Sequence, residues 1–238
     1  MGAGTVPAVD EKERLAVVRR LIADPPQIHT ISGPGQTPAP AGVWSTDHSC
    51  YEFIASVCRP GFRTLETGIG LSTVLFALIS GNHTCVAPFQ VEADNVLAYL
   101  ADHDIPHDHL TIHIQWSEDV LPQLKPTPLD LVFIDGGHAY PIPVIDWFYT
   151  APRLVEGGAL VVDDRQLPAV SEGLLQFLDR DSQWRSAAST AKWCAYYRAT
   201  GGDLREDWAD QHERGMFQFP PDPKSSVRAR LGRALGRG

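Results

Sequence analysis

The sequence predicts an α/β fold, a three-layer α/β/α sandwich around a mostly parallel, seven-stranded sheet whose last strand is antiparallel. Strand-forming and helix-forming stretches alternate five times between residues 63 and 162, which is the pattern of a parallel sheet covered by helices. The runs 129–134 and 159–162 are short and almost wholly apolar, as expected of strands that are buried on both faces. Two further short strands joined by a turn, at 184–188 and 192–198, predict the antiparallel finish.

The individual elements follow in order along the chain. Asp10 is expected to cap a helix that runs to about Ala23 and that Pro25 and Pro26 end. Thr46 is expected to cap a second helix over about 47–58. The strands are then expected at 63–66, 83–87, 110–115, 129–134, 159–162, 184–188 and 192–198, with helices at 71–80, 93–101, 119–124 and 168–179 and one more between the fourth and fifth strands.

Three regions are expected. Residues 1–45 hold the first helix and a loop rich in proline and glycine, 30–43, which is either a lid over a site or a plain connector. Residues 46–200 form the central α/β domain. Residues 201–238 are an extension that loses periodicity and ends in a basic tail, KSSVRARLGRALGRG, expected to be disordered at its end.

Composition limits the classes of protein to consider. The 238 residues are 43% hydrophobic, enough for one sizeable core. A formal charge of -9 and a pI near 5.4 argue against a dedicated nucleic-acid binder, which would be basic. The four cysteines form no CxxC pair, and no apolar run reaches the roughly 18 residues of a membrane span. We therefore expect a cytoplasmic protein with reduced thiols and no membrane span.

Three carboxylates follow the two most apolar strands. Asp135 comes directly after 129–134, and Asp163 and Asp164 come directly after 159–162. Ligands bind outside the carboxyl ends of parallel strands, and three carboxylates there are most simply tolerated around a cation. Ligation by oxygen alone favours Mg²⁺. Two structural roles stay open, because Asp135 could cap the following helix and the other two could be turn residues.

A glycine turn follows the first strand in the stretch Thr64–Thr73. Gly68 and Gly70 allow a sharp turn and a close approach of the backbone to a ligand. Thr73 takes the place of the third glycine of the dinucleotide fingerprint, and Glu66 would repel a diphosphate. These departures disfavour an NAD-dependent oxidoreductase. They suit S-adenosylmethionine, which carries an ammonium and a sulfonium but no phosphate.

These stretches resemble a family. LETGIGLST resembles the first motif of the class I S-adenosylmethionine-dependent methyltransferases, which have a Rossmann-like fold. LDLVFIDGGHAY and RLVEGGALVVDD resemble the later motifs of the branch that includes macrocin O-methyltransferase and other metal-dependent O-methyltransferases. The resemblance covers roughly residues 46–200 and implies that they are a methyltransferase domain.

The resemblance also implies roles for individual residues. The family ends its second strand with an acid that binds the ribose, whereas this chain has none there and Gln90 is the nearest substitute, with Glu92 beyond it. His138 matches the place of a general base in some members. A divalent ion, Mg²⁺ or another, would be held by Asp135, Asp163 and Asp164. The residues expected to bind the cofactor are Glu66, Gly68, Gly70, Ser72, Gln90, Trp116, Ser117 and Asp135.

The sequence thus predicts an O-methyltransferase that moves a methyl group, with the assistance of a divalent metal, to a hydroxyl of a small sugar or aromatic metabolite. One alternative is a metal-independent methyltransferase on the same fold, with His138 alone as its catalytic group. Another is a methyltransferase-like binding protein without activity. We expect a small-molecule acceptor and no nucleic acid as partner, and the sequence leaves both a monomer and a homo-oligomer open.

Overall fold

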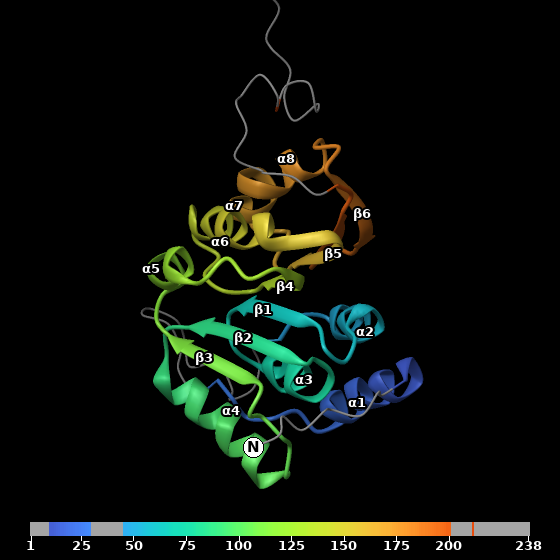
Figure 1. Ribbon diagram of the computed structural model, residues 1–238, viewed down its shortest axis with the longest axis vertical. Coiled ribbons are helices and arrows are strands. Elements are labelled where there is room, and N and C mark those ends of the chain that lie inside the picture. The colour runs from blue at the N-terminus through green and yellow to red at the C-terminus, as the bar shows by residue number, and fades with distance from the viewer. Residues whose placement is uncertain (1–9, 30–44, 201–210, 212–238) are drawn as a thin grey trace, which may run out of the picture.

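A single seven-stranded sheet forms the centre of the molecule (Figure 1). The computed structural model describes residues 10–29, 45–200 and 211. The strand order is β3-β2-β1-β4-β5-β7-β6, in which β1 to β5 are parallel and β7 is antiparallel to both neighbours. The predicted fold class is therefore confirmed. The strands are β1 (Arg63–Thr67), β2 (Asn82–Ala87), β3 (Leu110–Ile114), β4 (Leu129–Ile134), β5 (Leu154–Val162), β6 (Trp184–Ser189) and β7 (Cys194–Arg198).

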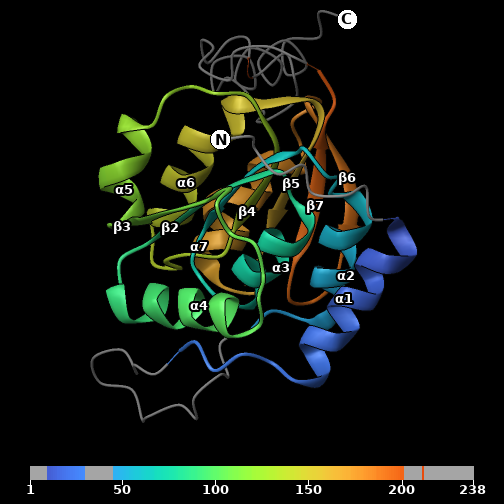
Figure 2. The same ribbon diagram turned by 60° about the horizontal axis from the view of Figure 1, so that its bottom comes forward.

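Helices cover both faces of the sheet (Figures 1 and 2). Buried side chains of α1 to α4 form one core cluster with the sheet, and those of α5 to α8, with the short turns between them, form the other. The helices are α1 (Glu11–Ala23), α2 (His48–Val57), α3 (Leu71–Ile79), α4 (Gln90–Asp102), α5 (Ser117–Val120), α6 (Ile142–Thr150), α7 (Pro168–Val170) and α8 (Gln176–Leu178), and the single turns are η1 (Leu121–Gln123), η2 (Ala151–Arg153) and the π-type η3 (Ser171–Leu175).

The apolar runs of β4 and β5 serve both cores at once. In β4, Leu131 and Phe133 pack toward α1–α4, whereas Val132 and Ile134 pack toward α5–α8. Successive side chains of a strand point to opposite faces, so a strand covered on both sides needs an unbroken apolar run. β5 begins earlier than predicted, at Leu154 rather than at residue 159, and pairs there across an irregularity in the ladder.

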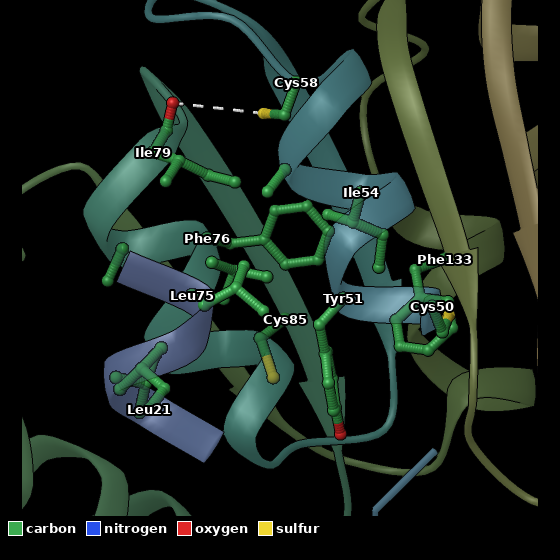
Figure 3. Close-up of a cluster of buried hydrophobic side chains, with 14 of the residues drawn as sticks. Leu21, Cys50, Tyr51, Ile54, Cys58, Leu75, Phe76, Ile79, Cys85 and Phe133 are labelled. Atoms are coloured by element: carbon green, nitrogen blue, oxygen red, sulfur yellow. Dashed lines mark hydrogen bonds between the residues drawn. The ribbon is translucent and has the colours of Figure 1, made fainter. Parts of the chain in front are cut away.

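The first helix belongs to the same core as the sheet. Leu21 is buried with Tyr51 of α2 and Phe76 of α3 (Figure 3). Asp10 caps α1 as predicted, because its carboxylate accepts a hydrogen bond of 2.8 Å from the Glu13 N–H. The segments predicted as a loop at 30–43 and as an extension at 201–238 lie outside the described residues, apart from 211.

The start of the second helix differs from the prediction. α2 begins at His48 with Asp47 at its N-cap position, so the prediction that Thr46 caps this helix is wrong, and Thr46 contacts the sheet instead. Within the described residues, no helix is long and apolar enough to cross a membrane.

Candidate active site

The glycine turn after β1 is pressed against the end of β4. Gly68 has φ of 99°, a conformation that side chains other than glycine's rarely allow. A Cβ atom on Gly68 would lie 2.3 Å from the backbone oxygen of Asp135. The Gly68 N–H donates to the Val86 carbonyl at 2.9 Å. Gly68 therefore fixes how closely the turn approaches Asp135.

Glu66 lies beneath this turn rather than on its surface. It is fully buried, and its Oε1 accepts a hydrogen bond of 2.5 Å from the Thr73 hydroxyl and lies 3.0 Å from His83 Nε2. The Thr73 oxygen in turn accepts the Gly70 N–H at 2.9 Å. Thr73, where a dinucleotide-binding turn has glycine, thus ties the turn to the strand. No pattern in the sequence indicates a role for His83, which β2 places beside Thr64 of β1.

Among the described residues, several buried side-chain oxygens around the turn form no hydrogen bond. They are Glu66 Oε2, the Thr67 hydroxyl and both carboxylate oxygens of Asp146 on α6. Burial raises the pKa of Asp146 to about 6. Buried polar atoms are normally satisfied, so such a group needs an explanation. These acceptor oxygens lie enclosed beneath the glycine turn and not on its surface.

Aromatic side chains flank the ends of β2 and β3. Trp116 is 53% exposed and Phe89 is 42% exposed, and their rings meet edge to face with 5.9 Å between centroids. Ser117 lies buried at the start of α5 and Ser72 lies buried in α3. A free tryptophan face at this rim is suited to stacking on a nucleobase.

The two candidates for the missing ribose acid are already engaged. The Gln90 amide donates to Asp94 Oδ1 at 2.8 Å on the surface of α4. Glu92 Oε1 lies 2.9 Å from His29 Nδ1. The chain segment before residue 30 thereby docks onto α4 beside the glycine turn, since a Cβ on Gly70 would lie 3.2 Å from the His29 ring.

The three acids predicted from the sequence meet at one rim. The Asp135 N–H bonds to the Thr67 carbonyl, at 2.9 Å, and the Asp163 N–H bonds to the Ile134 carbonyl, at 3.0 Å, which extends the ladder past the strand ends. Burial and the neighbouring Asp163 raise the pKa of Asp135 well above its usual range. Asp164 has φ of 51°, which turns the chain sharply after an extended strand, and such strained positions are frequent at functional sites.

His138 lies over the acids on the loop that follows β4. Its Nε2 is 3.0 Å from Asp164 Oδ2 and 4.0 Å from Asp135 Oδ1. The hydrogen bond with His138 holds the pKa of Asp164 well below its usual range, helped by Lys192. The next helix, α6, begins only at Ile142. Asp135 therefore does not cap that helix, and the structural role left open for it is excluded.

Two donors at the rim were missed from the sequence. The Thr46 hydroxyl donates to Asp163 Oδ1 at 2.5 Å across 117 positions of the chain. The Lys192 ammonium lies 3.4 Å from Asp163 Oδ2 and contacts Asp164 Oδ1 directly. Lys192 had a usable signal, because the residue that precedes an antiparallel strand lies at the edge where its parallel neighbours end. Thr46 had none.

The acids do not fit a divalent ion as they lie. Within the described residues, no three histidine, cysteine, aspartate or glutamate side chains are arranged to hold a metal. The metal site predicted at Asp135, Asp163 and Asp164 is therefore not found in this arrangement. The physical reason is that donor groups of the protein contact every carboxylate oxygen of Asp163 and Asp164. These contacts are Thr46 and Lys192 on Asp163, and Lys192, Gln166 and His138 on Asp164.

Residues 65–165 match the sequence family described as "Methyltransferase domain". None of the curated proteins matches the chain. Among solved structures, the O-methyltransferase NovP is similar at 15% identity with a TM-score of 0.59, over 80% of this chain and 100% of that one. The O-methyltransferase TomG from Streptomyces achromogenes, involved in tomaymycin synthesis and solved with S-adenosylmethionine, is similar at 20% identity with a TM-score of 0.53, over 81% and 92%.

The shared fold does not select the methyl acceptor. An rRNA methylase from Streptococcus thermophilus is also similar, at 15% identity with a TM-score of 0.51, over 67% of this chain and 100% of that one. At such identities the likeness concerns the fold alone. The acceptor must therefore be argued from the site.

Proposed function

We propose that this chain, an S-adenosylmethionine-dependent methyltransferase, transfers the methyl group to a hydroxyl oxygen of a small molecule. The match of residues 65–165 to the methyltransferase domain agrees with the enzyme class expected from the sequence. The position of His138 is the observation that supports a hydroxyl oxygen as the methyl acceptor. Its Nε2 lies 3.0 Å from Asp164 Oδ2, at the rim where β4 and β5 end. A hydroxyl must lose its proton during transfer, and this pair is a base with its orienting carboxylate.

The tautomer of His138 follows from its partner. A carboxylate only accepts hydrogen bonds, so Nε2 carries the hydrogen toward Asp164 and Nδ1 keeps its lone pair. The proton of the acceptor hydroxyl passes to Nδ1 as its oxygen attacks, and Asp164 stabilises the imidazolium that forms, as in hydrolase triads. S-adenosylmethionine supplies a methyl group on a sulfonium: the new O–C bond forms as the S–C bond breaks, and the sulfur keeps that electron pair.

The remaining cofactor contacts follow the sequence prediction. Gly68 and Gly70 bring backbone close to the methionine end of the cofactor, with Ser72 at the start of α3 near its carboxylate. Glu66 is buried beneath the turn and supports it through Thr73, whose hydroxyl donates to Glu66 and whose oxygen accepts the Gly70 N–H. Trp116, 53% exposed, stacks on the adenine with Ser117 beneath it. Gln90 and Asp135 remain predicted contacts.

Small acceptors are favoured over nucleic acid on charge. The chain carries a formal charge of -9, which would repel a phosphate backbone. Metal assistance, implied by the macrocin O-methyltransferase-like branch, is supported by the meeting of the three acids but opposed by the donors that already contact them. Chelation by EDTA distinguishes metal-assisted transfer, which it would abolish, from transfer without a metal, which it would not.

Calorimetry with S-adenosylmethionine and S-adenosylhomocysteine tests the cofactor. We expect saturable binding by the wild type and a loss of roughly 5- to 100-fold in affinity for Trp116→Ala, the range of one base stacked on an aromatic ring. Phe177→Ala on α8, also an exposed aromatic (39%), is the matched control and should bind normally. No measurable heat at millimolar ligand would rule out the proposed donor. Transfer of labelled methyl to sugars or phenols, retained in EDTA, tests the acceptor class.

A further inference from the structure

Lys192 brings a positive charge into the cluster of acids. Its ammonium lies 3.4 Å from Asp163 Oδ2 and in contact with Asp164 Oδ1, and its side chain is 30% exposed. A lysine side chain is a cation at neutral pH. The acids that the sequence predicted to require a cation therefore already have one within the chain.

The backbone holds Lys192 in this place from both sides. The Lys192 N–H donates to the Thr190 hydroxyl at 3.1 Å, and the Lys192 carbonyl accepts the Arg165 N–H at 2.9 Å. The Arg165 guanidinium also donates to the Thr190 carbonyl at 3.0 Å. These bonds fasten the β6–β7 turn to the residue that follows Asp164. The lysine is thus aimed at the acids by its loop and is not a surface side chain that happens to reach them.

Charge and space at the rim then favour the lysine over a divalent ion. A cation that bridged Asp163 and Asp164 would have to displace the ammonium from both carboxylates, and would also compete with the Thr46 hydroxyl for Asp163. An ammonium has three N–H donors. The two carboxylates use two of them, which leaves one for a further acceptor oxygen.

We propose that the Lys192 ammonium is the built-in cation of this methyltransferase: it takes the position between Asp163 and Asp164 that a divalent ion would take, excludes that ion, and donates its third N–H to the acceptor oxygen. The proposal rests on the proposed function and adds a residue to it. The negative charge that develops on the oxygen as His138 takes its proton is stabilised by the ammonium. Removal of one such donor costs on the order of 100-fold in turnover.

Manganese binding measured by electron paramagnetic resonance tests the exclusion directly. We expect no saturable Mn²⁺ binding by the wild type, by Lys192→Arg, which keeps the charge, or by Lys125→Ala, an exposed lysine outside the site. Lys192→Ala should gain saturable binding, and adding Asp163→Asn to that variant should abolish it. Should Lys192→Ala not fold, as judged by circular dichroism, Lys192→Gln replaces it.

Activity gives the second readout. Lys192→Ala should lose about 100-fold in turnover with an unchanged affinity for S-adenosylhomocysteine, and Mg²⁺ should restore part of the loss in this variant only. The proposal is overturned if the wild type binds Mn²⁺ and Asp163→Asn removes that binding, if a folded Lys192→Ala gains no Mn²⁺ site, or if its turnover is unchanged. Those results leave the proposed function intact, since that function fails if the wild type does not bind the cofactor or does not methylate a hydroxyl.

Discussion

Substitution of Gly68 by alanine tests whether the glycine turn is set by its contact with β4. Two costs add at this position. The φ of 99° costs an alanine about 1–2 kcal/mol. In addition the new Cβ would lie 2.3 Å from the Asp135 backbone oxygen, and relief of such an overlap costs typically another 1–3 kcal/mol. We expect Gly68→Ala to lower the free energy of unfolding by about 2–5 kcal/mol.

Gly61 provides the matched control for this prediction. Its φ is 93°, but a Cβ there would meet nothing within 4 Å. Gly61→Ala should therefore lose only the conformational part, about 1–2 kcal/mol, and both variants share the same small gain from a stiffer unfolded chain. Urea unfolding measures the difference as a shift in midpoint at constant slope. Equal losses in the two variants would refute the close approach of the turn to Asp135.

Three further predictions concern side chains of the site. Asp164→Asn should lower turnover about 100-fold with cofactor affinity retained, whereas the exposed Asp102→Asn on α4 should not; equal effects would assign Asp164 no role in orienting His138. Burial raises the pKa of Asp146 to about 6, so its contribution to stability is present below the unfolded pKa near 4 and is lost as pH rises through about 6. Asp146→Asn should therefore be stabilising by up to roughly 2–3 kcal/mol at pH 8 and by little at pH 4 in urea unfolding, and a gain that does not depend on pH would contradict the burial argument. Thr73→Val, which leaves the Gly70 N–H and Glu66 Oε1 short of a partner, should destabilise by about 1–3 kcal/mol, whereas Thr73→Ser should recover most of the loss.

The sheet could be predicted because its signals are local. The apolar run of β4 must alternate Leu131 and Phe133 with Val132 and Ile134 between two cores, and any strand with that composition is buried on both faces. The position of Asp135, Asp163 and Asp164 followed from the same reasoning, since parallel strands end at one edge. The start of β5 was predicted wrongly, at residue 159 and not at Leu154, because the glycines before residue 159 resemble a turn.

What the sequence could not show is how side chains are partnered across the chain. The sequence predicts Glu66 as a cofactor contact but does not show that Thr73 and His83 engage it in the interior. It predicts Thr46 as a helix cap but does not show that its hydroxyl donates to Asp163. The sequence predicts a divalent ion among the three acids, whereas the positive charge beside Asp163 and Asp164 in the structure is the Lys192 ammonium. Local composition specifies the need for a positive charge and not which residue supplies it.

The most direct measurement is a crystal structure of the wild type with S-adenosylhomocysteine, grown with Mn²⁺ and recorded at the manganese absorption edge. The account predicts the ligand at the Gly68–Gly70 turn with its adenine on Trp116, the Lys192 ammonium between Asp163 and Asp164, and no anomalous peak at the rim. A manganese peak bridging Asp135, Asp163 and Asp164, with Lys192 turned away, would contradict it.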